Sequence, residues 1–162
     1  MAASANQTYD RNLSVSRVYD APRRLVFEAW TKPEHLKQWF APRPYTLPHC
    51  EVDLRVGGTW RYAMRSPSGD EHWVTATYRE IVELERLVMM TEFGDMPGVA
   101  FEQRITFADE GAATKVTFEM TFPEPASLTP EQFALFAPRL AGAKPGSTQT
   151  LAQLAELVAK LR

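Results

Sequence analysis

Residues 51–122 form a long stretch in which apolar and polar residues alternate. The alternation is clearest in Thr59–Arg65, in Val99–Phe107 and in Lys115–Phe122. A period of two indicates β-strands with one buried face. Short loops containing glycine separate these runs, so the stretch predicts an antiparallel sheet. One apolar face of such a sheet needs another element to cover it.

The C-terminal segment is the one element long enough to provide that cover. Leu151, Leu154 and Leu161 lie at helical spacing along it. We expect this last helix to begin after Gly146-Ser147-Thr148. A curved sheet wrapped around one helix leaves a space between the two, and there we expect the functional site.

The N-terminal part predicts three smaller elements before the main run of strands. Leu13–Tyr19 alternates and predicts a first strand. Val26, Phe27 and Trp30 then share one face of a short helix, and Pro33 begins a second short helix. The fold class is therefore α+β: a curved antiparallel sheet of six to seven strands around a long C-terminal helix, with two short helices between strands 1 and 2.

Local details complete the predicted order of elements. Val52–Leu54 predicts a short strand that leads into a turn at Gly57-Gly58, and an ion pair between Asp53 and Arg55 would stabilise that turn. The run Thr129-Pro130-Glu131-Gln132 resembles a capping box and predicts a short helix through Leu140.

Composition limits the function classes. The chain has 162 residues, which predicts one domain over residues 12–162 after a flexible polar tail over residues 1–11. With 44% apolar residues and a net charge of −2, we expect an ordered globular protein that does not bind nucleic acid. The sequence contains no run of about 18 apolar residues, so we expect no membrane span. We expect no signal peptide, and the single cysteine, Cys50, fits a cytoplasmic location.

Metal and cofactor chemistry has no support in the motifs. His35, His49 and His72 lack the spacing of a metal site, so we expect no metal ion and no cofactor. Cys50 is better explained as a structural residue than as a nucleophile. Gly57-Gly58 precedes a strand, and phosphate-binding glycines precede a helix.

The unusual feature that remains is the number of aromatic and methionine side chains on or beside the predicted sheet. Large rings and flexible thioethers are typical of a cavity for an apolar ligand, although each one could equally fill the core. Polar residues among them, such as Gln103 and His72, would orient a ligand. The candidate ligand-binding residues are Trp39, Phe40, Trp60, Tyr62, Met64, His72, Tyr78, Met90, Glu92, Phe101, Phe118 and Leu154.

Several motifs in fixed order resemble one known family. The chain is similar to START-like, helix-grip domains of the SRPBCC superfamily, in the branch of the heat-shock-protein ATPase activator. The motifs that carry the resemblance are Ala21-Pro22-x-x-x-Val26-Phe27-x-Ala29-Trp30, Pro33-Glu34-x-Leu36-x-x-Trp39-Phe40-Ala41-Pro42, Asp53-Leu54-Arg55-Val56-Gly57-Gly58-Thr59-Trp60-Arg61, Pro67-x-Gly69 and the run from Tyr78 to Val88.

The resemblance implies a deep cavity between the sheet and the C-terminal helix, with lipids, polyketides or other hydrophobic molecules as ligands. It also admits cyclases, aromatases and co-chaperones. The sequence departs from the family pattern where Ser147, in place of an aromatic residue, follows Gly146, and where residues 123–145 are long and rich in proline. The chain shows no counterpart of the activator's separate N-terminal domain, so we expect no direct activation of a chaperone ATPase.

Three functions stay open at this point. The first is the binding of a small hydrophobic or aromatic molecule without covalent chemistry, by a monomer or a homodimer, with no catalytic residue assigned. The second is an enzyme of the cyclase, aromatase or hydrolase type, with His72, Tyr78 and Glu92 as the side chains to test as acid or base. The third is a stress-linked interaction module with an exposed apolar patch near residues 123–145.

Overall fold

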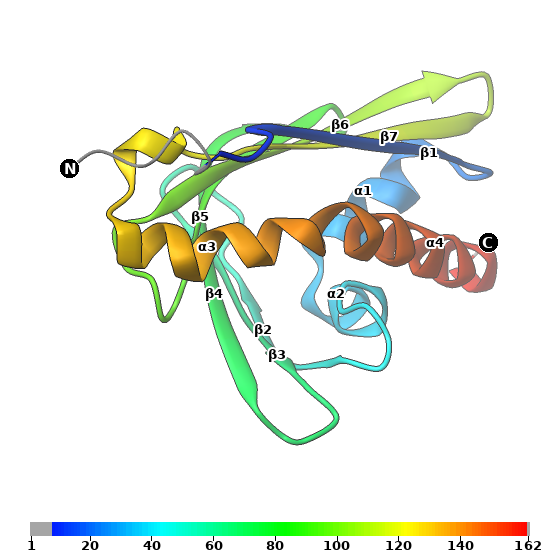
Figure 1. Cartoon of the computed structure of the whole chain (residues 1–162). Coiled ribbons are helices and arrows are strands. Elements are labelled where there is room, and N and C mark those ends of the chain that lie inside the picture. Colours follow the sequence, from blue (N-terminus) through cyan, green and yellow to red (C-terminus); the bar gives the residue numbers. More distant parts are fainter. Residues whose placement is uncertain (1–7, 162) are drawn as a thin grey trace.

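The computed structural model describes residues 8–161, which form one curved sheet wrapped around a long helix (Figure 1). The strands are β1 (Asn12–Tyr19), β2 (Thr46–Val52), β3 (Thr59–Arg65), β4 (Glu71–Val82), β5 (Arg86–Phe93), β6 (Ala100–Glu110) and β7 (Ala113–Thr121). The helices are α1 (Arg23–Thr31), α2 (Pro33–Trp39), α3 (Pro130–Ala141) and α4 (Ala143–Leu161), with a 3-10 turn, η1, at Pro125–Ser127.

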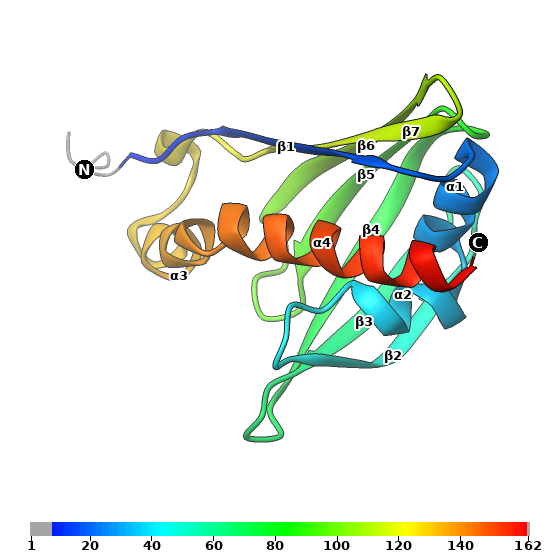
Figure 2. The same ribbon diagram turned by 90° about the vertical axis from the view of Figure 1, so that its right-hand side faces the viewer.

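The sheet is antiparallel throughout, with strand order β1-β7-β6-β5-β4-β3-β2. Consecutive strands from β2 to β7 are neighbours, and β1 closes the order beside β7. Figure 2 shows α4 lying along the concave side of this sheet, with α1 and α2 at its C-terminal end and α3 at the other. The α+β helix-grip fold predicted from the sequence is confirmed.

The first part of the sheet differs from the prediction. The strand expected over Val52–Leu54 lies earlier, over Thr46–Val52, and includes Pro48. Because β2 is an edge strand, a proline costs it no essential hydrogen bond. Residues 53–58 form the turn instead.

That turn has the chemistry the sequence indicated. Arg55 Nε donates to Asp53 Oδ2 at 2.8 Å, as expected for the ion pair. Gly57 has a φ of 86°, and a Cβ on Gly58 would lie 2.2 Å from the Asp53 carbonyl oxygen. Both positions therefore need glycine.

The boundary between the last two helices also differs from the prediction. The Thr129 capping box is present and opens α3 as expected. However, α4 begins at Ala143, before Gly146, because helix α3 ends at its C-cap residue, Gly142. The Gly146 N–H donates to the Gly142 carbonyl at 2.9 Å, so Gly146 lies inside the first turns of α4.

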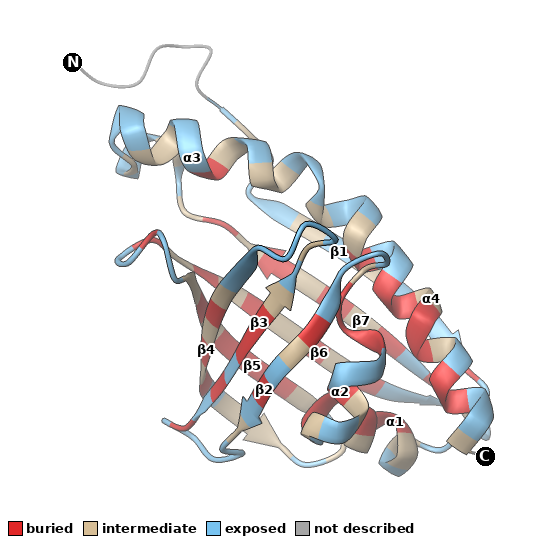
Figure 3. Ribbon diagram, turned by 90° about the horizontal axis from the view of Figure 1, so that it is seen from below, coloured by how far each residue is buried: buried red, intermediate tan, exposed pale blue. Residues whose placement is uncertain are grey.

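The core lies between α4, α1, α2 and the sheet. Figure 3 shows buried residues along the inner side of α4, whereas α3 is exposed or half-buried apart from one residue. Leu151, Leu154, Leu157 and Val158 form the buried face of α4. They belong to the same cluster of buried side chains as Trp30 of α1. The C-terminal two thirds of α4 is thus closely packed.

One polar side chain fixes this packed end. Gln153 is 5% exposed, and its Nε2 donates to the carbonyl oxygens of Trp39 at 2.8 Å and Ala41 at 2.9 Å. Its Oε1 accepts from the Arg43 N–H at 3.0 Å and from Gln149 Nε2 at 3.2 Å. All hydrogen-bonding positions of this buried amide are used, which connects α4 to the chain that follows α2.

Most of the tail expected over residues 1–11 lies outside the described residues. Within the described part, the Tyr9 ring stacks on Phe133 with 5.8 Å between centroids. The Tyr9 hydroxyl donates to the Pro123 carbonyl, and Arg11 Nε donates to the Phe122 carbonyl at 2.9 Å. These contacts connect the start of β1 to the segment that leads into α3.

Candidate functional site

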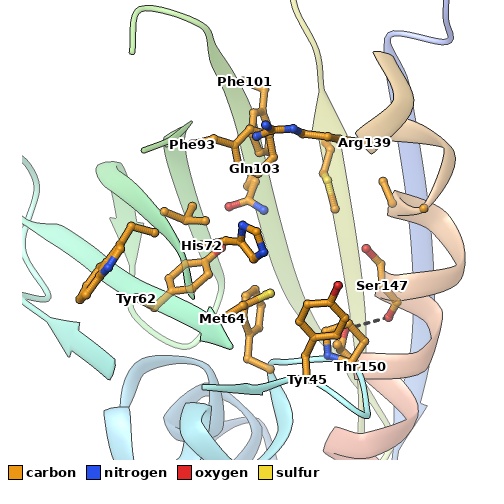
Figure 4. Close-up of a pocket in the computed structure, with 18 of the residues that line it drawn as sticks. Tyr45, Tyr62, Met64, His72, Phe93, Phe101, Gln103, Arg139, Ser147 and Thr150 are labelled. Atoms are coloured by element: carbon orange, nitrogen blue, oxygen red, sulfur yellow. Dashed lines mark hydrogen bonds between the residues drawn. The ribbon is translucent and has the colours of Figure 1, made fainter. Parts of the chain in front are cut away.

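A cavity of about 990 Å³ lies between the sheet and the helices, at the end of the groove where α3 meets α4. Figure 4 shows Tyr62, Met64 and His72 of β3 and β4 facing Ser147 and Thr150 of α4 across it. The volume lies within the range of pockets that hold drug-sized molecules.

Apolar side chains from the concave face of the sheet line most of this cavity. Phe101 of β6 and Phe118 and Met120 of β7 are buried and line it. Phe93 lies beside Phe101, with 5.5 Å between ring centroids. The alternation of β6 and β7 directs these side chains to one face, so the surface is made by strand geometry.

An ion pair closes one side of the cavity. Arg139 of α3 donates to Asp95, in the loop after β5, with its Nη1 at 2.9 Å from Oδ1. The Arg139 guanidinium also lies over the Phe93 ring, 4.7 Å from its centroid. The hydrogen bond from Arg139, with a smaller effect of nearby His72, lowers the pKa of the Asp95 carboxyl. We call Arg139, Asp95 and Phe93 the latch, because they connect α3 to the β5–β6 loop.

Two polar side chains of the wall, Gln103 and Thr150, form hydrogen bonds within the protein. Gln103 of β6 is 4% exposed, and its Oε1 accepts from the Thr91 hydroxyl at 2.8 Å. On the helix side, Thr150 Oγ1 donates to the Ser147 carbonyl at 3.1 Å. The cavity is therefore apolar with a few fixed polar points, as is typical of small-molecule sites.

Six of the predicted ligand-binding residues line this cavity, and six lie elsewhere. Those in the lining are Phe40, Tyr62, Met64, His72, Phe101 and Phe118; those elsewhere are Trp39, Trp60, Tyr78, Met90, Glu92 and Leu154. The inward direction of the strand residues of β3, β6 and β7 follows from their alternation. That these six bind a ligand stays a prediction.

Four of the other six lie in the packed core. Trp39 is buried at the end of α2 and donates its Nε1 to the Ala29 carbonyl at 2.9 Å. Trp60 lies behind Phe40, with 4.6 Å between ring centroids. Tyr78 and Leu154 are also almost fully buried in the core cluster. These residues support the cavity wall or the packed end and do not form the wall surface.

Met90 and Glu92 lie on the other face of the sheet. Their neighbour Met89 pairs with Gln103 of the cavity wall, so the alternation of β5 directs Met90 and Glu92 away from it. Glu92 Oε1 accepts from the Gly98 N–H at 2.7 Å, which gives this carboxylate a role in the β5–β6 loop.

The structure does not bring together the three side chains considered as acid or base. His72 is exposed at the cavity, whereas Tyr78 lies six residues further along β4, a distance of about 20 Å along a strand. Burial, with a smaller effect of Cys50, raises the pKa of the Tyr78 hydroxyl, which holds it protonated. Burial likewise raises the pKa of the Cys50 thiol, which disfavours a nucleophilic thiolate.

The candidate residues included Leu154 of α4 but none of the helix residues that line the cavity. Arg139, Ser147 and Thr150 all line it. Two signals pointed to this region: the proline-rich segment 123–145 and the serine after Gly146. The position of these α3 and α4 residues relative to the sheet depends on the boundary between the two helices at Gly142.

Within residues 8–161, no three His, Cys, Asp or Glu side chains are grouped so that they could hold a metal ion. No described helix combines the length and apolar composition needed to cross a membrane.

A curved antiparallel sheet around a C-terminal helix, with a cavity between them, defines a helix-grip domain of the START-like, SRPBCC class. Residues 20–159 match the family described as Activator of Hsp90 ATPase homolog 1-like protein. The match covers most of the chain, so the protein belongs to this family. A search of proteins with curated descriptions finds no match.

Solved structures from several bacteria have the same fold. Protein NE0264 from Nitrosomonas europaea is 26% identical with a TM-score of 0.77, and the match covers 97% of each chain. Protein CV1439 from Chromobacterium violaceum is 28% identical with a TM-score of 0.73, over 91% of this chain and 96% of that one. A protein from Rhizobium leguminosarum is 26% identical with a TM-score of 0.68, over 92% and 94%.

Proposed function

We propose that the protein binds one small hydrophobic or aromatic molecule in the cavity between the sheet and helices α3 and α4, without covalent chemistry. The observation that carries this proposal is the cavity of about 990 Å³ lined by Tyr62, Phe101 and Phe118, beside a core that is closely packed elsewhere. Protein interiors are close-packed, so a space of this size beside the core favours an occupant.

The energy of binding would come from apolar burial. At roughly 25 cal/mol per Å², a ligand that buries about 300 Å² of apolar surface gains about 7.5 kcal/mol before the costs of association. Aromatic walls add edge and face contacts with a ring-containing ligand. These numbers correspond to micromolar or weaker binding unless polar contacts add to them.

The other two hypotheses have less support. An enzyme that uses His72, Tyr78 and Glu92 together would need one shared site, and only His72 of the three lines the cavity. An interaction module was expected to have a closed or empty interior and an exposed apolar patch near residues 123–145. Leu135 is the one large apolar side chain of the described residues in that segment that is strongly exposed.

The experiment that tests the proposal combines native mass spectrometry with dye binding. The neutral dye N-phenyl-1-naphthylamine is titrated into the protein and into two leucine variants of α4. Gly146→Leu extends a side chain from the cavity lining, where nothing lies within 4 Å of the position that a Cβ would take. Thr148→Leu adds a similar side chain on the exposed face of the same helix. Leucine is a good helix former at both positions.

We expect 1:1 dye binding, weakened more than tenfold by Gly146→Leu and unchanged by Thr148→Leu. A mass adduct that is lost on denaturation would add direct support. No dye binding together with no adduct, or equal binding by both variants, would contradict the proposal. The cytoplasmic location of the protein and its monomeric or homodimeric state stay predictions, to be measured by cell fractionation and by sedimentation.

A further inference from the structure

The Gln103 side chain is a buried polar group of the cavity wall with unused hydrogen-bonding capacity. Its Oε1 is occupied by the Thr91 hydroxyl at 2.8 Å, and Thr91 is fully buried behind it. No hydrogen bond of its Nε2 is formed among the described residues, although the residue is only 4% exposed. Figure 4 shows the Gln103 amide in the interior of the cavity, between Phe101 and His72.

The Thr91 hydroxyl fixes which end of the amide faces the cavity. With Oε1 accepting from Thr91, the Nε2 group is left as the end available to a ligand. A primary amide nitrogen carries two N–H donors and no acceptor. The wall at this point is therefore selective for an acceptor atom.

The charged groups of the cavity do not compete for this role. Arg139 is paired with Asp95 through two hydrogen bonds. Arg61 is exposed, and its guanidinium lies over the Trp73 ring at 4.0 Å from the centroid, on the strand face opposite Tyr62. His72 lies at the exposed rim. The immediate surroundings of Gln103 are apolar, with Phe101 two residues before it on β6 and Phe118 of β7 on the same face. Burying a carboxylate against such a surface without a free cation is costly, so a neutral acceptor fits better.

We propose that Gln103 determines ligand specificity by donating an N–H to a neutral carbonyl oxygen, and that the ligands are therefore apolar or aromatic carbonyl compounds. This inference rests on the proposed function, since it concerns a ligand in the same cavity. A ligand without an acceptor would displace solvent from the amide and leave the N–H groups unpaired, which lowers affinity. A carbonyl compound of the same shape replaces that hydrogen bond.

The test uses two rigid tricyclic compounds of nearly the same shape, 9-fluorenone and fluorene, which differ by a carbonyl in place of a methylene. Equilibrium dialysis below their solubility limits gives the affinity of each for the wild-type protein and for Gln103→Met. Methionine keeps the unbranched shape of glutamine and removes the amide. The quantity measured is the fluorenone-to-fluorene affinity ratio. The hydration of the free compounds is the same in both experiments, so it cancels when the ratio is compared between the two proteins.

We expect the ratio to fall about fivefold in Gln103→Met, the size of one net hydrogen bond. A merely structural role would weaken both compounds alike and leave the ratio unchanged. A spectroscopic readout supports the assignment: the infrared carbonyl stretch of bound fluorenone should lie at lower wavenumber in the wild type than in Gln103→Met.

Three outcomes would overturn the inference. An equal ratio in both proteins, with both compounds bound, would remove the role of Gln103 and leave the binding function intact. A ratio change for 2-hydroxyfluorene instead of fluorenone would mean that the amide presents its oxygen. Failure of both compounds and of N-phenyl-1-naphthylamine to bind the wild type would overturn the proposed function, and this inference with it.

Discussion

Each end of the groove between the sheet and α4 contains a buried glutamine. One end is closely packed, whereas the other encloses a cavity. At the C-terminal end, Gln153 is 5% exposed and makes four hydrogen bonds. At the other end, Gln103 is 4% exposed and accepts one hydrogen bond, with its N–H groups facing a cavity. The same side chain closes the core at one end and leaves a donor for a ligand at the other.

The difference follows from what fills each end. Helices α1 and α2 place Trp30 and Trp39 under the C-terminal part of α4, with 4.7 Å between the two ring centroids. Helix α3 lies at the other end of the groove (Figure 2), and Phe136 is its one buried residue, so it adds little packing there. The packed end therefore contributes more to the unfolding free energy than the cavity end, whose residues can be substituted at a smaller cost in stability.

The largest expected difference comes from deleting the same atoms at the two ends. Leu154→Ala, at the packed end, should cost about 3 to 4 kcal/mol of unfolding free energy, since Leu154 is fully buried and leaves a cavity. Leu140→Ala, in the wall of the existing cavity, should cost about 1 kcal/mol because that residue is half-buried. Urea denaturation of both variants measures this. Equal losses would mean that the two ends are equally packed.

The two glutamines give the second contrast. Gln153→Met removes two donors to the carbonyls of Trp39 and Ala41 and leaves the Arg43 N–H without its acceptor, which should cost about 2 to 3 kcal/mol. Gln103→Met removes one bond and leaves the Thr91 hydroxyl unpaired, at about 1 kcal/mol. Thermal unfolding of the two variants makes the comparison. A larger loss for Gln103→Met would show that its amide is structural.

The sequence predicted the sheet and its faces well, for a physical reason. Strand alternation fixes direction locally, so the inward side of Tyr62, Phe101 and Phe118 could be read from the chain alone. The prediction did not separate Met90 and Glu92 from the wall. Residues 87–90 form a continuous apolar run, and both faces of β5 are largely buried there, so the run carries no period-two signal.

The sequence could not tell a cavity wall from a packed core. Trp60 and Tyr62 both point inward from β3, and only Tyr62 lines the cavity. Which inward residues are covered depends on where α1, α2 and α3 lie relative to α4. That arrangement depends on the break at Gly142, which the proline-rich segment 123–145 did not reveal.

Adding a methyl group should have opposite effects at the two ends. Gly146→Ala places its Cβ where nothing lies within 4 Å, inside a helix, and should stabilise the protein by about 0.5 to 1 kcal/mol. Ala29→Val enlarges a fully buried side chain of α1 and should cost about 1 to 2 kcal/mol. The unfolding free energies of both variants measure the effects. Destabilisation by Gly146→Ala would argue against free space beside α4.

The smallest expected effect concerns the latch at the cavity end. Because the Arg139 hydrogen bond lowers the pKa of Asp95, the latch stabilises the folded state above the ordinary carboxyl pKa of 3.8. That contribution is lost as the pH falls through the lower pKa of the folded protein. The Asp95 side chain is 63% exposed, so solvent screening limits the pair to about 0.5 kcal/mol.

Asp95→Asn should therefore lower the unfolding free energy by about 0.5 kcal/mol at pH 7 and by nothing below the folded pKa of Asp95, where the wild-type carboxyl is also neutral. Urea denaturation at both pH values measures this, with Glu124→Gln as a control at the exposed Arg11–Glu124 ion pair away from the cavity. If the latch governs access, Asp95→Asn also speeds dissociation of N-phenyl-1-naphthylamine at pH 7, whereas Glu124→Gln does not. An unchanged dissociation rate would mean that ligands pass elsewhere, and the latch would then only stabilise α3.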